Sequence, residues 1–144
     1  MKYLIMVLAL AGCAEVPPSD LSIMVNADVT HRVASFNALR GVHMPVPQVV
    51  FGGSAVGEEF SASNPIYINP DICAKDIEDC LDDTVPHELA HWALDYYGYY
   101  HTHLDITPNS RRYEASENAH DGVWCDTMRA FGGVPEKHGY CLNH

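Results

Sequence analysis

The sequence predicts an α+β domain, in which a small mixed sheet packs on a histidine-bearing helix that has one helix before it and one after it. Three observations predict this class. Apolar residues recur at helical spacing over residues 20–41, short runs bounded by proline and glycine at residues 45–53 and 64–70 are typical of strands, and a capped apolar segment follows Thr84. At 144 residues the chain has room for one domain of this kind.

The first helix is expected over residues 20–41, with Gly41 placed to end it. Four apolar residues recur on one of its faces: Val25, Val29, Val33 and Phe36. PVPQVVFGG and NPIYINP are expected to be strands, and AVGEEFSAS between them is a further strand or a loop. DICAKDIEDCL, residues 71–81, is expected to form one short helix.

The next helix carries the sequence HELAH. Thr84 is a suitable N-cap for it, and Pro86 lies in its first turn, where the missing N–H costs nothing. Four residues form its apolar stripe: Val85, Leu89, Trp92 and Tyr96. His87 and His91 lie together on the opposite side, about 40° apart. Because most of the helix is apolar, these imidazoles need partners when it is buried.

These two histidines can both bind one Zn²⁺, at about 2.0–2.1 Å, because residues four apart share a helix face. Glu88 can reach a water on that ion and act as the general base of a hydrolysis. The alternative is two core histidines that donate to backbone carbonyls. A catalytic zinc also needs a third protein ligand and an open position. The HExxHxxGxxH class of zincins is excluded, because Leu94 and Tyr97 stand where it has glycine and histidine.

Five residues further along are candidates for the third ligand: His101, His103, Glu114, Glu117 and His120. His120 is favoured, because a helix that starts there places three apolar residues toward the core and ends at two glycines: Trp124, Met128, Phe131, Gly132 and Gly133. A histidine that only caps the helix is the alternative. Glu114 and Glu117 stay open as replacements for His120, or as carboxylates that orient a zinc-bound imidazole.

The beginning of the chain resembles a bacterial lipoprotein signal. MKYLIMVLAL carries one positive charge and an apolar run too short to span a bilayer, and LAGC follows, ending at Cys13. The resemblance implies a signal peptide over residues 1–12, a lipidated Cys13 with a tether to residue 20, and a domain over residues 21–144. The alternative is a signal peptide that ends near a chance cysteine. Ala14 lacks the aspartate that favours inner-membrane retention, so an outer-membrane, periplasmic location is expected in a Gram-negative cell.

Export also changes what is expected of the other cysteines. An even set in an oxidising compartment predicts disulfides, and proximity favours Cys73 with Cys80 and Cys125 with Cys141. A structural zinc site is the weaker alternative, because the close CxxC pairs of such sites are absent from the sequence.

Three segments together resemble SprT-like metallopeptidases, over about half of the chain: IYINP, HELAH and HDGVWCDTMRAFG. They match the strand of form IxLNP, the HExxH helix and the later HGxxFxxxxxxxG helix of that family, in the same order. The resemblance implies a zincin-like fold, with His87, His91 and His120 as zinc ligands and Glu88 as general base. Asp121 displaces the family's glycine by one position, and the family's zinc ribbon has no counterpart in this sequence.

The expected function is therefore that of a membrane-anchored, zinc-dependent endopeptidase that acts on proteins or peptides as a monomer. A net charge of −11 and basic residues that form no cluster argue against a nucleic-acid partner. Two alternatives stay open: a non-catalytic zinc-containing binding module, and a metalloamidase acting on cell-wall peptides. The presence of Glu88 disfavours the first, because a structural zinc site has no use for a base.

Overall fold

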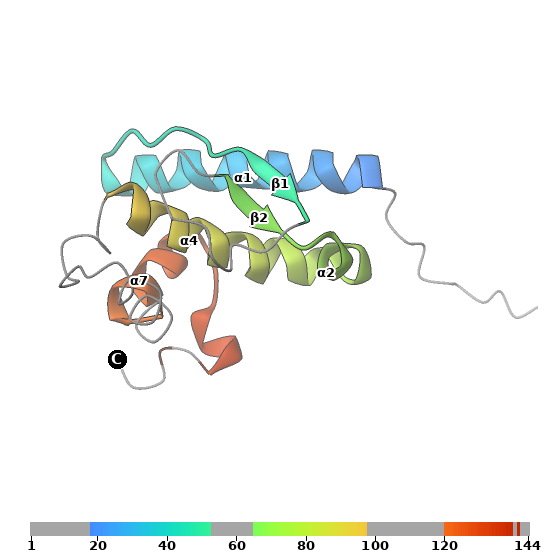
Figure 1. Cartoon of the computed structure of the whole chain (residues 1–144). Helices are drawn as coiled ribbons and strands as arrows, with labels where there is room; N and C mark the ends of the chain where they lie inside the picture. Colours follow the sequence, from blue (N-terminus) through green and yellow to red (C-terminus); the bar gives the residue numbers. More distant parts are fainter. Residues whose placement is uncertain (1–17, 53–64, 98–119, 140, 142–144) are drawn as a thin grey trace, which may run out of the picture.

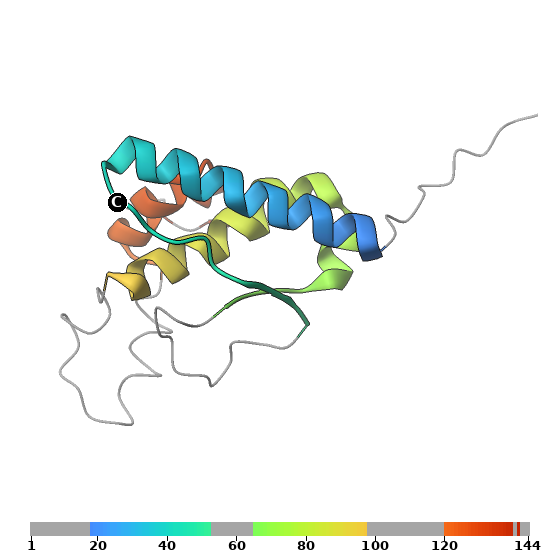
Figure 2. The ribbon, with the colours of Figure 1, turned by 90° about the horizontal axis from the view of Figure 1, so that it is seen from above.

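The structure is a computed structural model that describes residues 18–52, 65–97, 120–139 and 141 (Figure 1). Its elements follow in this order: α1 (Pro18–Arg40), β1 (Val49–Phe51), β2 (Ile66–Ile68), α2 (Pro70–Lys75), α3 (Ile77–Asp79), the π-helical turn η1 (Cys80–Thr84), α4 (Val85–Tyr96), α7 (Gly122–Ala130) and the 3-10 turn η2 (Pro135–His138). Helix α4 is contacted by α1, β2 and α7. Figures 1 and 2 show α1 and α4 side by side, with the strand pair along them. This is the predicted α+β class in a helix-rich form.

Helix α1 supplies much of the core. The predicted stripe is confirmed, because Val25, Val29 and Val33 are at most 1% exposed and Phe36 is 5% exposed. The helix ends as predicted: Gly41 adopts φ +65°, and the N–H of the next residue donates to the carbonyl oxygen of Asn37 at 3.1 Å. This left-handed glycine closes the helix and turns the chain toward β1.

The strands β1 and β2 form a two-stranded parallel sheet with Val49 opposite Ile66. The prediction of a mixed sheet is wrong for the described residues, since this pair contains no antiparallel strand. Ile66 and Ile68 are 3% and 0% exposed, so β2 turns both isoleucines into the core next to α4. AVGEEFSAS lies outside the described residues.

The prediction that Thr84 caps the HELAH helix is wrong. Thr84 has helical dihedral angles and makes no capping hydrogen bond, because it ends the π-helical turn η1, which continues directly into α4. The cap lies further back, at Asp76, whose side chain accepts from the N–H of Asp79 at 3.0 Å. Asp76 also has extended dihedral angles, so the single short helix expected over residues 71–81 is divided into α2 and α3.

The described cysteines pair as proximity suggested. The structure joins Cys73 to Cys80, with Cα atoms 4.8 Å apart, and Cys125 to Cys141, with Cα atoms 6.0 Å apart. The first disulfide links α2 to η1, and the second links α7 to the chain beyond η2. Both therefore brace elements next to the histidine-bearing helix.

The N-terminal predictions fall outside the part of the chain that the structure describes. This applies to the signal peptide over residues 1–12, to Cys13 and to most of the tether. Among the helices of the described residues, none combines the length and the apolar character needed to cross a bilayer.

Candidate metal centre

Helix α4 presents two of the three predicted ligands. Its apolar side is fixed in the core by Val85 and Leu89, both fully buried. His87 and His91 are half-buried on another side of the helix. Because they are one helical turn apart, their rings are neighbours, with ring centroids 4.9 Å apart and an interplanar angle of 65°.

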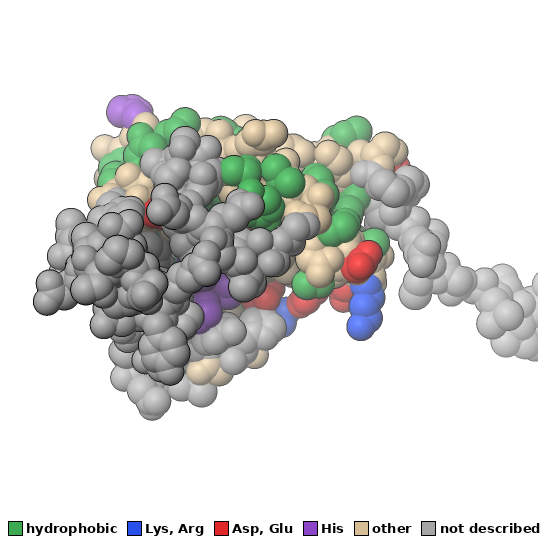
Figure 3. Space-filling view, in the orientation of Figure 1, with side chains coloured by type: hydrophobic (Ala, Val, Ile, Leu, Met, Phe, Trp, Pro, Cys, Tyr) green, Lys and Arg blue, Asp and Glu red, His purple; other side chains and the backbone are tan. Residues whose placement is uncertain are grey.

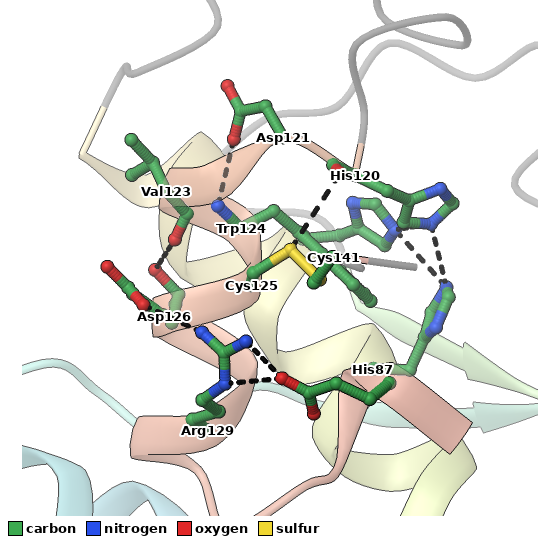
Figure 4. Close-up of a disulfide and its surroundings, with 12 residues drawn as sticks. His87, His120, Asp121, Val123, Trp124, Cys125, Asp126, Arg129 and Cys141 are labelled. Atoms are coloured by element: carbon green, nitrogen blue, oxygen red, sulfur yellow. Dashed lines mark hydrogen bonds and ion pairs between the residues drawn. A yellow bond between two sulfur atoms is a disulfide. The ribbon is translucent and has the colours of Figure 1, made fainter. Parts of the chain in front are cut away.

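The third predicted ligand reaches the same place from the start of α7. His120 lies two residues before the first residue of that helix, and the intervening Asp121 is its N-cap. The Asp121 carboxylate accepts from the N–H of Trp124 at 2.9 Å. The residue that departs from the family pattern therefore has a defined role: it starts the helix immediately after the histidine. Figure 4 shows this cap and the neighbouring rings of His87 and His120.

The three histidines converge through one nitrogen each. The Nε2 atom of His91 lies 3.2 Å from that of His87 and 3.2 Å from that of His120, and the remaining pair is 3.4 Å apart. Among the described residues these side chains form the one group of three or more that could hold a metal ion. Three Zn–N bonds at tetrahedral angles require nitrogens about 3.3 Å apart. The three nitrogens are therefore spaced closely enough to bind one metal ion together.

The protonation of the histidines also suits a metal. Burial, followed by the charges of the other two histidines, holds the pKa of His91 well below its ordinary value. Burial also lowers the pKa of His120. These imidazoles are therefore neutral at pH 7, which is the form that binds a metal. One cation between the nitrogens accepts a lone pair from all three at once, which hydrogen bonds among three such atoms cannot do.

Glu88 directly follows His87 in helix α4. It is half-buried, and it makes no hydrogen bond or ion pair with the described residues. Burial alone raises the pKa of its carboxyl group to about 7. A carboxyl group with such a pKa can both accept and release a proton near neutral pH, which is what general acid–base chemistry requires.

Trp124 forms the inner wall of the cluster. It is fully buried, and its ring centroid lies 4.9 Å from that of His87, 5.3 Å from that of His91 and 4.4 Å from that of His120. Trp124 extends from α7 toward the histidines in Figure 4. The sequence placed this residue on the inner face of the helix but did not predict contact with all three imidazoles. Its position four residues after His120 was the available signal.

The three histidines are half-buried, so part of each side chain is accessible from the surface of the described residues. Figure 3 shows histidine side chains at the molecular surface beside acidic ones. A separate hollow of about 340 Å³ lies between α1, the end of α4 and α7, and is lined by seven residues: Phe36, Arg40, Val42, Tyr97, Val123, Asp126 and Thr127. The three histidines do not line it. The alternative ligands Glu114 and Glu117, together with His101 and His103, lie outside the described residues.

We expect Asp121→Ala to destabilise the protein by about 1 kcal/mol, because the first turn of α7 loses its capping acceptor. Asp121→Asn should retain most of the stability, since asparagine is an equally good N-cap. Urea unfolding of the three metal-free proteins measures both changes. Equal stabilities of the alanine and asparagine variants would contradict a capping role.

Comparisons of this chain with protein-family models, with curated proteins and with solved structures found no match. The resemblance to SprT-like metallopeptidases therefore stays a prediction, which depends on the three sequence segments. The histidine cluster does not depend on that resemblance, because the positions of the three side chains define it.

Proposed function

We propose that this chain is a zinc-dependent endopeptidase of SprT-like type with a zincin-like fold. The observation that carries the proposal is the convergence of three histidine Nε2 atoms, 3.2–3.4 Å apart. Two of these histidines lie on α4, which also carries Glu88. Three histidines that leave a fourth position open are the ligand set of a catalytic zinc, whereas structural sites are closed by four protein ligands. Zinc is favoured over calcium or magnesium because those ions prefer oxygen ligands.

A bound Zn²⁺ would lower the pKa of a water molecule to about 7 and polarise the carbonyl group of the substrate. His87, His91 and His120 would hold that ion with their Nε2 atoms. The Glu88 carboxylate would accept the proton of the attacking water and then donate it to the nitrogen of the leaving amine. Trp124, fully buried behind the imidazoles, would exclude water from the inner side of the site.

The proposal includes a location. The lipobox-like LAGC segment and Cys13 support a lipoprotein held at a membrane, on the periplasmic side in a Gram-negative cell. The two disulfides of the described residues are consistent with an oxidising compartment. An acidic chain of net charge −11 supports protein or peptide substrates over DNA-bound ones.

Zinc analysis and casein cleavage by the purified protein test this proposal. We expect about one zinc per chain, cleavage of casein, loss of cleavage with a chelator, and its recovery when zinc is restored. Zinc binding without cleavage of casein or other unfolded proteins would contradict the endopeptidase. Release of amino groups from peptidoglycan fragments, in that case, would identify the cell-wall amidase instead.

A further inference from the structure

One arginine bonds to the turn that leads into α4 and to the residue that ends α7. Arg32 lies on α1, and its side chain is 13% exposed. Its Nη2 donates to the carbonyl oxygen of Leu81 at 2.8 Å, and its Nη1 donates to that of Phe131 at 2.6 Å. Leu81 lies in η1, which runs directly into α4, and Phe131 follows the last residue of α7. One guanidinium therefore joins the turn that precedes the HELAH helix to the C-terminal end of the helix that follows His120.

Neighbouring groups fix the position and the orientation of the Arg32 guanidinium. A guanidinium is planar and presents its donors in a rigid fork, so it sets the separation of the two carbonyl oxygens that it binds. The Nε of Arg32 donates to the carboxylate of Asp28 at 2.7 Å, one turn earlier on α1, and this contact orients the plane. Gly132 leaves the space that Nη1 needs, because a Cβ atom there would lie 2.9 Å from it.

Neighbouring contacts hold the same end of α7. The Phe36 ring of α1 stacks on the Phe131 ring, with centroids 4.2 Å apart and an interplanar angle of 10°. Gly133 approaches the first turn of α4 so closely that a Cβ atom on it would lie 3.0 Å from the Cβ of Pro86. The C-terminal end of α7 is thus fixed against α1 and α4, and His120 lies at the opposite end.

A small tilt of α7 would be enough to disturb the metal site. The helix has nine residues and is therefore about 13 Å long. A tilt of about 5° around its C-terminal end moves the other end by about 1 Å, whereas metal–ligand distances tolerate about 0.2 Å. The contacts that hold the end of α7 therefore contribute to the position of His120 relative to the other two histidines, together with the packing of Trp124.

We propose that Arg32 is a positioning residue of the metal centre, which fixes His120 relative to His87 and His91 by bonding to Leu81 and Phe131. The proposal rests on the metal site proposed above. Arg32 acts through the backbone of the two ligand-bearing segments and touches neither metal nor substrate. A purely structural arginine would affect only unfolding, whereas a positioning arginine changes how tightly the folded protein binds its metal.

Metal affinity of folded Arg32→Lys tests this. Lysine keeps the charge but cannot bridge both carbonyl oxygens with the same fork. We expect Zn²⁺ affinity, measured against a competing chelator, to fall by about tenfold, comparable to the loss of an outer partner of a metal ligand. The visible spectrum of bound Co²⁺ should also change, because the ligand geometry changes. Both are measured at a temperature where circular dichroism shows the metal-free protein to be folded.

Arg129→Lys is the matched control. Arg129 is an exposed arginine of α7 that bonds to Asp126 and Glu136 and has no such bond to α1 or α4. Its loss should leave Zn²⁺ affinity and the Co²⁺ spectrum unchanged. A Zn²⁺ affinity of Arg32→Lys equal to that of the wild type, with only a lower unfolding temperature, would overturn the proposal.

Asp28→Asn provides a second variant in case Arg32→Lys does not fold. It keeps Arg32 and removes only the carboxylate charge that orients it, at a position whose side chain is 19% exposed. We expect a decrease in Zn²⁺ affinity of about threefold, and an unchanged affinity would count against the proposal. If the wild-type protein itself binds no Zn²⁺, the metal site fails. If the wild type binds it and both variants bind equally well, the role of Arg32 alone fails.

Discussion

Replacing Glu88 by glutamine will lower the rate of peptide hydrolysis by about 10²–10⁴-fold and leave the metal in place. Glutamine has nearly the shape of glutamate but cannot take a proton from the attacking water. The Nε2 atoms of the three histidines are untouched by the change, so zinc content should stay that of the wild type. The kcat for a peptide substrate and the zinc content after dialysis measure the two parts of the prediction.

Glu78→Gln is the control for this variant. Glu78 is an exposed glutamate of α3, a few residues before the histidine-bearing helix, and the same change in charge there should leave kcat unaltered. If Glu88→Gln retains most of the activity, Glu88 is not the base. If it loses both activity and zinc, the half-buried carboxyl group has a structural role at the site instead.

Replacing His120 by alanine will weaken zinc binding by at least about 100-fold, because loss of an outer partner of a ligand alone costs about 10–100-fold. Wild-type protein in the presence of zinc at 100 times its Kd should gain about 2.7 kcal/mol of unfolding free energy. The alanine variant should gain little at the same zinc concentration. Thermal unfolding with and without zinc compares the two directly.

His31→Ala provides the matched control, since His31 is an exposed histidine of α1 and belongs to no metal-binding group of the described residues. It should keep the full zinc-dependent shift in unfolding temperature. A full shift in His120→Ala would mean that another residue supplies the third ligand. Glu114 and Glu117 would then be the first residues to replace, because they are the alternatives that the sequence leaves open.

Those parts of the fold that depend on local pattern could be predicted from the sequence. Buried apolar residues recur at helical spacing from Val25 to Phe36 of α1. Gly41 adopts the left-handed conformation that commonly ends a helix. The sequence also allowed us to predict that His120 lies near the α4 histidines, because Trp124 and Met128 identify the buried face of α7. In each case, spacing along the chain carries the information about which side is buried.

Other features depend on contacts that sequence spacing does not encode. Threonine is a residue type that commonly caps helices, but Thr84 lies inside continuous helical structure. The π-helical turn η1 ends at Thr84 and leads directly into α4, so Thr84 makes no capping hydrogen bond. The bonds from Arg32 to Leu81 and Phe131 join residues 49 and 99 positions apart, to backbone carbonyls that every residue possesses. No residue type marks such an acceptor. The direction of the strands likewise depends on how the chain returns to the sheet.

The position of Trp124 gives the protein an optical signal of its own. Its indole lies with its centroid 4.4–5.3 Å from those of the three imidazoles, so a paramagnetic ion such as Cu²⁺ or Co²⁺ held by them would quench its fluorescence at close range. The chain has one other tryptophan, Trp92, which packs against Tyr96 and contributes a background emission. Occupancy of the centre can therefore be followed by light emission, without a label and without a substrate.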